Sequence, residues 1–439
     1  MGTHKKLLVY ILFIVLGALA AILLDFLGIG KFLIVIASLI ILIASIINFR
    51  LGILLFVFSI PLSFVLGGIA FSGFTLTPYK VLGVVIFIGW LYNLFTEKIR
   101  FKFDTLGFVM LLFLAASAIS LFLSSNVSVA LEYLSSIFLF FILYLILMSS
   151  VESVGFIKKI IGSLIISGVF SALIGLAQYL SFSNFGMRIV MADELVRVAG
   201  LIGDPNEFGI FLICLLPFIF FNYFTAESKI KKSLFAASFI IILISMLLTF
   251  SRTVLLMFFV ITPLLLIKKA KSKGFIILFI GTLLILLLMM PSFVNRFNKV
   301  SIDSGISIRG YLISSSLDVF RDYPIFGAGL GTIRNNNYMQ LVTHNSYVQI
   351  AAEIGIIGLL LFIAIIFISF RNLYKVKKSI NKNNADKNIL LIAESLQLAL
   401  VVYLGVMLFF SFHYAKLFWI FIILTSVLIN IKDERHEKK

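Results

Sequence analysis

The chain has 439 residues, of which 62% are hydrophobic and only 13% are charged, and its mean hydropathy is +1.17. These values exclude a soluble globular domain. In so apolar a chain, the formal net charge of +17 predicts membrane topology and attraction to anionic lipid head groups, and it gives no reason to expect a nucleic-acid partner.

Apolar runs long enough to cross about 30 Å of hydrocarbon recur along the whole sequence. They predict an all-α polytopic membrane protein with about fourteen transmembrane helices, in a range of twelve to fourteen. In chain order the predicted spans are 6–24, 32–48, 51–68, 81–95, 105–123, 128–149, 160–180, 207–224, 233–250, 253–268, 274–291, 346–370, 388–410 and 412–431. The first run imitates a signal peptide, but apolar residues continue to Leu24, which favours an uncleaved span.

The charges predict an orientation for these spans. When the connections are assigned alternately to two sides, 25 of the 36 Lys and Arg residues fall on the side of the N-terminus and 11 on the other. The positive-inside rule then predicts that both termini are cytoplasmic. The inner set contains four arginines and the outer set seven. Because the arginine fork binds carboxylate or phosphate at two points and keeps its charge, we expect the outer face to bind an anion.

The polar material concentrates in two outer segments, 181–206 and 292–345, which are too long to be simple turns. We expect both to belong to one transmembrane domain that covers 1–439. The first long extracytoplasmic loop carries Arg197 and ends in Asp204-Pro205-Asn206, a combination typical of turns. Asp204 or Asn206 is expected to cap the helix that follows.

The second segment, 292–345, is the main extracytoplasmic loop and has internal order. Apolar residues in 307–324 follow a roughly helical spacing that ends at a proline, which predicts an amphipathic helix over the outer mouth of the bundle. This helix carries Arg309 and Arg321. The glycine-rich stretch "IFGAGLG" then predicts a turn whose backbone can come close to another segment. No Walker or dinucleotide pattern accompanies it.

A tight turn within "TFSRTV" joins the ninth and tenth predicted spans and holds Arg252 at the outer surface. Two interpretations fit this position equally well. Arg252 is either an interfacial arginine whose charged end reaches out to water or a residue that binds an anionic substrate.

The stretch "THNS" places His344 and Asn345 where the main outer loop meets the next span. A histidine in such a position serves as a proton switch, a metal ligand or a general base. No H-x-x-x-H, H-E-x-x-H or D-x-D pattern lies on the outer side, so we expect neither a resident metal nor another cofactor. Metal binding stays an alternative, because Asp204, Asp193 and Glu194 could supply ligands. Asn345 is expected to orient the histidine ring or, more simply, to cap the next helix.

As a general base, neutral His344 would take a proton from a sugar hydroxyl while outer arginines stabilise charge on a departing phosphate. Nucleotide sugars are cytoplasmic, so a donor used outside must be lipid-linked, and polyprenyl diphosphate is the expected carrier. The expected acceptor is a glycan, a glycolipid or a protein, and membrane lipids and envelope-assembly proteins are further expected partners. A flippase or transporter for the lipid-linked oligosaccharide is the main alternative, although no half-to-half repeat supports it.

One buried acid needs its own interpretation. Glu353 lies inside a predicted span, nine residues beyond His344. At 100° per residue it occupies the opposite helix face, so direct cooperation with His344 is not expected. Ionisable groups in spans are costly unless they are paired, and we expect Glu353 to make a structural ion pair or hydrogen bond.

Three stretches resemble the O-antigen ligase and polysaccharide polymerase family of integral membrane glycosyltransferases. They are "RVAGLIGDPNEFG", "SRTVLL" and the ordered block "RGYLISSSLDVFRDYPIFGAGLG…THNSYVQIAAEIGIIGLL", which together cover about 197–360. The resemblance implies a bundle related to the C-type glycosyltransferase fold. It also implies metal-independent, inverting glycosyl transfer at the extracytoplasmic side of a bacterial-type cytoplasmic (inner) membrane.

The resemblance further implies roles for single residues. His344 matches the essential histidine of the family, and Arg252 and Arg309 match its diphosphate-binding arginines. Arg197 lies in a matching stretch. The fourteen predicted spans exceed the usual number in the ligases of the family, which favours a polymerase, and a protein O-oligosaccharyltransferase stays open because the acceptor is not defined.

Overall fold

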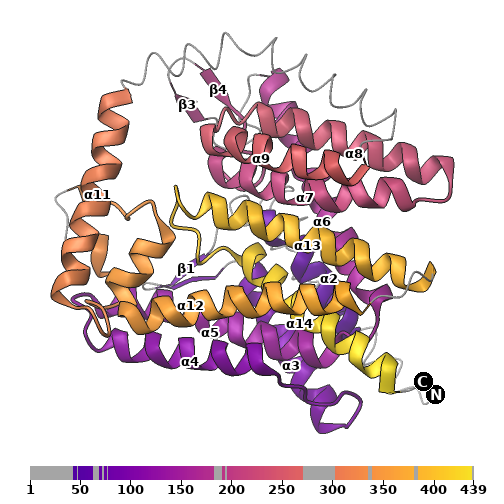
Figure 1. Cartoon of the computed structure of the whole chain (residues 1–439), viewed down its shortest axis with the longest axis horizontal. Coiled ribbons are helices and arrows are strands. Elements are labelled where there is room, and N and C mark those ends of the chain that lie inside the picture. The colour runs from indigo at the N-terminus through magenta and orange to yellow at the C-terminus, as the bar shows by residue number, and fades with distance from the viewer. Residues whose placement is uncertain are drawn as a thin grey trace, which may run out of the picture.

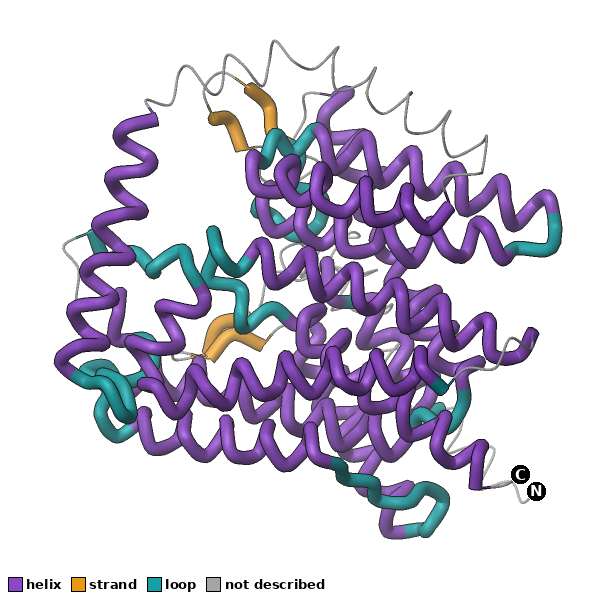
Figure 2. The backbone as a smooth tube through the Cα atoms, viewed as in Figure 1, coloured by secondary structure: helices purple, strands orange, loops and turns teal. Residues whose placement is uncertain are grey.

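The computed structural model describes residues 43–46, 48–62, 69–71, 74–76, 78–181, 190–192, 195–269, 302–334, 339–379 and 384–437. This part of the chain is a bundle of helices with two small hairpins (Figures 1 and 2). Six described helices are long and apolar enough to cross a membrane. The predicted all-α, polytopic membrane architecture is therefore confirmed.

The elements follow the predicted order along the chain. The helices are α2 (Phe49–Phe58), α3 (Pro78–Phe95), α4 (Thr105–Leu121), α5 (Val127–Ser150), α6 (Val154–Ser181), α7 (Pro205–Thr225), α8 (Lys229–Leu247), α9 (Arg252–Lys269), α11 (Ile302–Asp322), α12 (Ser346–Lys378), α13 (Asn384–Val406) and α14 (Lys416–Glu437), with 3-10 turns η1 (Ile60–Leu62) and η2 (Thr332–Arg334). The strands are β1 (Ile69–Phe71), β2 (Phe74–Leu76), β3 (Val190–Ala192) and β4 (Leu195–Arg197).

The predicted count of fourteen spans is not confirmed. The described residues contain six candidate spans and four shorter apolar helices, Phe49–Phe58, Lys80–Phe95, Thr105–Leu121 and Arg252–Leu265. The predicted spans 6–24 and 274–291, and most of 32–48, lie outside the described residues.

Two features differ from the sequence expectation. Antiparallel hairpins pair Ile69 with Leu76 and Val190 with Arg197, whereas no strands were predicted. Strands of three residues are too short for hydrophobic alternation to reveal them. The predicted amphipathic helix exists as α11, but it begins at Ile302, five residues before the predicted start.

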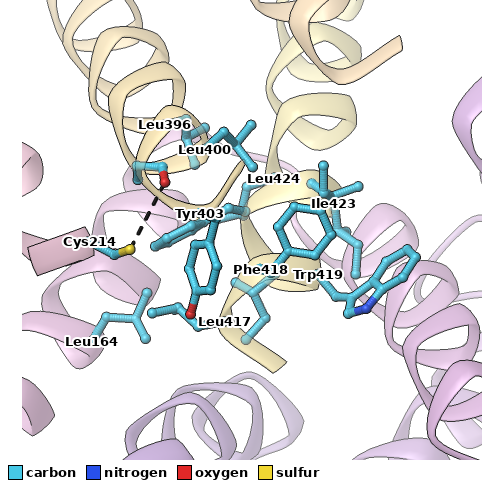
Figure 3. Packing of buried hydrophobic residues seen from close by; sticks show 14 of the residues in the cluster. Leu164, Cys214, Leu396, Leu400, Tyr403, Leu417, Phe418, Trp419, Ile423 and Leu424 are labelled. Atoms are coloured by element: carbon cyan, nitrogen blue, oxygen red, sulfur yellow. Dashed lines mark hydrogen bonds between the residues drawn. The ribbon is translucent and has the colours of Figure 1, made fainter. Parts of the chain in front are cut away.

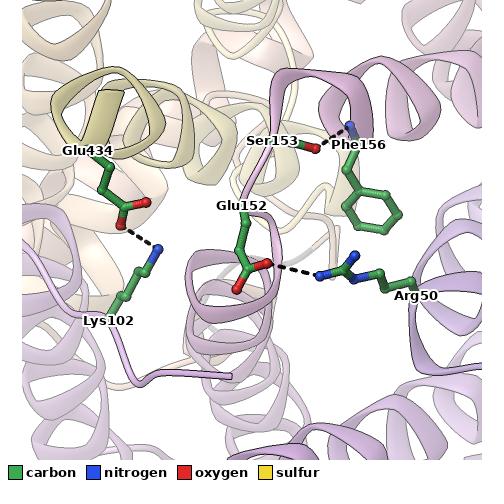
Figure 4. Close-up of polar contacts among 6 residues, drawn as sticks. All are labelled: Arg50, Lys102, Glu152, Ser153, Phe156 and Glu434. Atoms are coloured by element: carbon green, nitrogen blue, oxygen red, sulfur yellow. Dashed lines mark hydrogen bonds and ion pairs between the residues drawn. The ribbon is translucent and has the colours of Figure 1, made fainter. Parts of the chain in front are cut away.

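Ion pairs identify one end of the bundle. Arg50 of α2 pairs with Glu152 beyond α5 at 3.0 Å, and Lys102 before α4 pairs with Glu434 of α14 at 2.5 Å (Figure 4). Both hairpins and α11 lie at the opposite end (Figure 1). We call this opposite end the outer end, after the orientation that the positive-inside rule predicts.

Buried side chains of α6, α7, α13 and α14 meet in one part of the bundle core (Figure 3). Cys214 of α7 faces the Ala399 carbonyl of α13 at 4.0 Å, and the rings of Tyr403 and Phe418 lie 5.7 Å apart. Because α7 is apolar on all sides, it is stable only where other helices or lipid surround it.

The glycine-rich turn after α11 inserts into a break in α12. Gly355 interrupts α12 with φ 76° and ψ −172°. Ala328 N–H donates to the Ala352 carbonyl at 2.9 Å, and Ile356 N–H donates to the Pro324 carbonyl at 2.8 Å. The turn thus satisfies backbone groups that the break exposes, which would be costly within a membrane.

Glu353, just before the break, is 1% exposed. Its Oε1 accepts a hydrogen bond from Gln349 Nε2 at 3.0 Å, and its backbone carbonyl accepts one from the Ser120 hydroxyl at 2.6 Å. The expected structural hydrogen bond of Glu353 is confirmed.

Replacing Gly355 by alanine is expected to lower the thermal unfolding midpoint of the detergent-purified protein. The residue has a positive φ, and an added Cβ would lie 2.1 Å from the Ile325 carbonyl oxygen. Such strain costs about 1–3 kcal/mol before any rearrangement. Gly162→Ala in α6 is the matched control, since a Cβ there meets nothing within 4 Å. Equal midpoints for the two variants would contradict the role assigned to the break.

Candidate functional site

The turn between α8 and α9 presents Arg252 at the outer end. Phe250 has φ 47°, a left-handed conformation that reverses the chain within four residues, and Arg252 is the first residue of α9. The surrounding residues Thr249, Phe250 and Ser251 are buried, whereas Arg252 is half-buried. The predicted tight turn is confirmed.

Arg197 supports this turn from the neighbouring loop. It is 7% exposed, and it donates from Nε to the Thr249 carbonyl at 2.9 Å and from a terminal nitrogen to Asn206 Oδ1 at 3.0 Å. Asp204 caps α7 by accepting from the N–H groups of Asn206 and Glu207. Of the two expected caps, Asp204 is the residue that caps α7. The Asn206 side chain instead accepts a hydrogen bond from Arg197.

One face of α11 points towards the start of α12. Arg309, Leu312 and Ser316 recur at intervals of three and four residues, which places them on the same helix face. Leu312 is 1% exposed, and the Ser316 hydroxyl lies 2.8 Å from that of Thr343. The Ser316–Thr343 hydrogen bond fixes α11 beside His344, which follows Thr343 directly.

His344 has φ 55°, a left-handed conformation that histidine adopts more readily than most residues. Asn345 caps α12 by accepting from the N–H groups of Tyr347 and Val348, each at 3.0 Å. Its amide also donates to the Leu408 carbonyl at 3.1 Å. The simpler expectation for Asn345, a helix cap, is confirmed, and the cap also ties His344 to the loop between α13 and α14.

Phe410 brings the predicted residues together. Its ring lies edge-on to His344, with centroids 6.2 Å apart and planes at 78°, and the Arg309 guanidinium carbon lies 5.8 Å from its centroid. We call Phe410, His344, Arg309 and Arg252 the Phe410 cluster. Sequence reasoning missed Phe410, because hydropathy extended a predicted span through residue 410, whereas α13 ends at Val406 and 407–415 form a loop.

The positive charges of the cluster lower the pKa values of neighbouring groups. Burial, followed by the nearby Arg309 charge, lowers the pKa of His344 below its ordinary value of 6.5. Partial burial, followed by the nearby Arg252 charge, lowers the pKa of Arg309, whose guanidinium nevertheless stays protonated at neutral pH. The site therefore combines two arginines and a neutral imidazole, and an anion would relieve the repulsion between the arginines.

If His344 acts as a base, kcat/KM for glycosyl transfer is expected to fall on acidification with a midpoint below pH 6.5. The base form is the neutral ring, and a lowered pKa keeps the ring neutral to lower pH. The ring itself can be titrated by NMR in histidine-labelled protein, with His344→Asn identifying its signal. Arg309→Gln should move that midpoint upwards, since a repelling charge is removed. An unchanged midpoint would show that the two side chains are not coupled.

Arg321 lies outside the cluster. It is exposed near the end of α11 and donates to Asp318 of the same helix at 2.7 Å. Within the described residues, no group of three His, Cys, Asp or Glu side chains gathers in a way that could hold a metal ion. Of the three acids that the sequence offered as metal ligands, Asp204 serves as a helix cap, and Asp193 and Glu194 lie outside the described residues.

The fold and the cluster define a polytopic membrane protein with a cationic site beside a histidine. Residues 237–363 match the family described as O-antigen ligase. Over this segment, which is less than a third of the chain, the protein is similar to enzymes of that family, whose substrates are lipid-linked glycans. The matched segment contains Arg252, Arg309 and His344, which confirms the resemblance that the sequence motifs indicated. No curated protein matches the chain in sequence.

Proposed function

We propose that the protein transfers a glycan from a polyprenyl-diphosphate-linked oligosaccharide to a glycan or glycolipid acceptor at the extracytoplasmic face of the membrane. The Phe410 cluster is the observation that carries this proposal. His344 and Arg309 both lie against the Phe410 ring, the Arg252 charge acts on Arg309, and all three residues fall within the segment that matches the O-antigen ligase family. A base and an anion site are the two elements that this reaction needs.

In the proposed reaction, a nitrogen of His344 accepts the proton of the acceptor hydroxyl. The acceptor oxygen attacks the anomeric carbon of the donor sugar from the face opposite the diphosphate, so the configuration inverts. The bond between the anomeric carbon and the phosphate oxygen breaks, and its electron pair leaves with polyprenyl diphosphate. Arg252 and Arg309 stabilise the negative charge of the leaving group, which a metal ion does in other enzymes, and the proposed step is metal-independent.

Arg197, predicted as a third diphosphate ligand, receives a different role in this proposal. Its guanidinium is buried and donates to Thr249 and Asn206. Thr249 lies three residues before Arg252, so Arg197 is better suited to position the turn that carries Arg252 than to contact the diphosphate. Arg321 is likewise left out of the binding site, because it is exposed and paired with Asp318.

The test is an assay of the purified protein in nanodiscs with a polyprenyl-diphosphate-linked oligosaccharide, with and without excess EDTA. We expect transfer to persist with EDTA, and the length of the product distinguishes a polymerase, which gives a ladder, from a ligase, which gives a single addition. Loss of transfer on chelation would contradict the metal-independent step. Donor translocation across the bilayer without any transfer product would favour the flippase instead. Transfer to a peptide hydroxyl would identify a protein O-oligosaccharyltransferase.

A further inference from the structure

A cavity of about 240 Å³ lies at the outer end, separate from the arginines of the Phe410 cluster. It is bounded by the start of α7, the end of α13, the loop 407–415 and the start of α14, with Ile60 of η1 on one side. Drug-sized ligands occupy pockets of about 300–1,000 Å³. The volume therefore suits one small ring and not a whole oligosaccharide.

Two opposite charges line this cavity. Glu207 lies in the first turn of α7, where its side chain is exposed to the cavity, and Lys416 is the first residue of α14. The two side chains attract each other, and Asp204 adds a repulsive effect on Glu207. A carboxylate that accepts and an ammonium that donates offer both kinds of hydrogen bond to hydroxyl groups. Because the pair is close to neutral overall, it suits an uncharged ligand better than a phosphate.

Further polar and aromatic residues line the same cavity, namely Ser411, Tyr414, Phe412 and Tyr403. The hydroxyl oxygens of Ser411 and Tyr414 are themselves buried, so the groups offered to a ligand are Glu207, Lys416 and the rings. Aromatic rings beside a carboxylate and an ammonium group are complementary to a sugar ring, which has apolar C–H faces and a polar edge.

The cavity is close to the base. The Phe412 ring on its wall stacks on Phe410 at 5.3 Å and 12°, and Phe410 in turn lies 6.2 Å from the His344 ring. The loop that carries both phenylalanines is fixed to the start of α12, since the Ser346 hydroxyl donates to the Phe410 carbonyl and accepts from Phe412 N–H, both at 2.8 Å.

We infer that the cavity bounded by Glu207 and Lys416 binds an uncharged sugar residue of the acceptor glycan. This inference rests on the proposed function, in which His344 separates a donor side, defined by the arginines, from an acceptor side. The acceptor hydroxyl must lie against the base, and the diphosphate must lie against Arg252 and Arg309. The cavity is connected to the base through the rings of Phe412 and Phe410 and carries a nearly balanced pair of charges, so we assign it to the acceptor side.

Kinetics with separate variation of the two substrates test the inference. The probe is an uncharged synthetic oligosaccharide that supports transfer by the wild-type protein in nanodiscs. Glu207→Gln and Lys416→Gln are each expected to raise the KM for this acceptor about tenfold while the KM for the lipid-linked donor stays unchanged. Glu227→Gln is the matched control, since Glu227 is an exposed carboxylate just beyond the other end of α7. A raised donor KM with an unchanged acceptor KM would overturn the assignment to the acceptor.

A charge exchange separates sugar binding from a purely structural ion pair. The double variant Glu207→Lys with Lys416→Glu keeps an opposite pair but inverts its positions. We expect this variant to unfold at nearly the wild-type temperature and still bind acceptor weakly. Restoration of the wild-type acceptor KM would show that only the ion pair matters and would overturn the inference.

Direct binding keeps the inference testable if no transfer is found. Saturation-transfer NMR would measure binding of glucose, galactose and N-acetylglucosamine to the wild-type protein and to Glu207→Gln. Loss of sugar binding in the variant, with binding of inorganic diphosphate retained, supports the cavity even where the proposed reaction fails. Equal sugar binding by the two proteins would overturn it.

Discussion

Replacement of His344 by alanine is expected to lower the turnover of glycosyl transfer by about 10²–10⁴-fold, the usual contribution of a general base. Binding of the lipid-linked donor should change little, because the arginines that would hold its diphosphate stay in place. Turnover is measured with both substrates saturating, and the donor Kd is measured separately on the same nanodisc preparation. Strong residual turnover in the variant would exclude His344 as the base.

Backbone strain has to be separated from chemistry in this experiment. His344 has φ 55°, and alanine tolerates a left-handed conformation poorly. His344→Asn avoids this difficulty, since asparagine adopts the conformation readily but is no base, and it should lose as much turnover as His344→Ala. Gln340→Ala is the control for the backbone, because Gln340 has φ 52° in the same segment. A loss of turnover in Gln340→Ala equal to that in His344→Ala would point to the backbone and not to the imidazole.

Replacement of Arg309 or Arg252 by alanine is expected to weaken donor binding. A hydrogen bond to a charged group contributes about 1.5–3 kcal/mol, which corresponds to an increase in the donor Kd of about tenfold to a hundredfold. Lysine at either position keeps the charge but loses two-point contact, so we expect a smaller loss. Binding is measured with the intact lipid-linked donor and, in competition, with inorganic diphosphate.

The control for these variants is Arg334→Ala, which removes an exposed outer arginine outside the Phe410 cluster. Its donor affinity should stay close to that of the wild-type protein. If all three alanine variants weakened binding equally, the donor would be attracted by the overall charge of the outer face and not by a defined site. Weaker binding at higher salt in the wild-type protein alone would not distinguish these cases, because both depend on charge.

Much of the site was predictable because its residues lie next to local signals. Arg252 stands at a tight turn, Arg309 lies one turn before the buried Leu312 of α11, and His344 precedes a capping asparagine. Turns, caps and amphipathic periodicity are set by neighbours in the chain, so a single sequence reveals them. The hydropathy that identified a polytopic membrane protein is a local signal of the same kind.

Other roles depend on contacts between distant segments. Arg197 looked like a third anion ligand, but it is buried and donates to Thr249 and Asn206. Phe410 is one of 48 phenylalanines, and no property of its neighbours distinguishes it from a residue that faces lipid. Only the packing of the loop 407–415 against the start of α12 places its ring between His344 and Arg309.

The sequence by itself determined that this protein is a membrane bundle with cationic outer segments and a histidine at a helix start. The tertiary structure decided which of those cations gather, how the glycine-rich turn fills the break at Gly355, and that Glu207 and Lys416 share a cavity. The physical reason is that hydrophobicity, capping and helix periodicity act over a few residues. Packing and charge interactions act through space between residues that the sequence holds far apart.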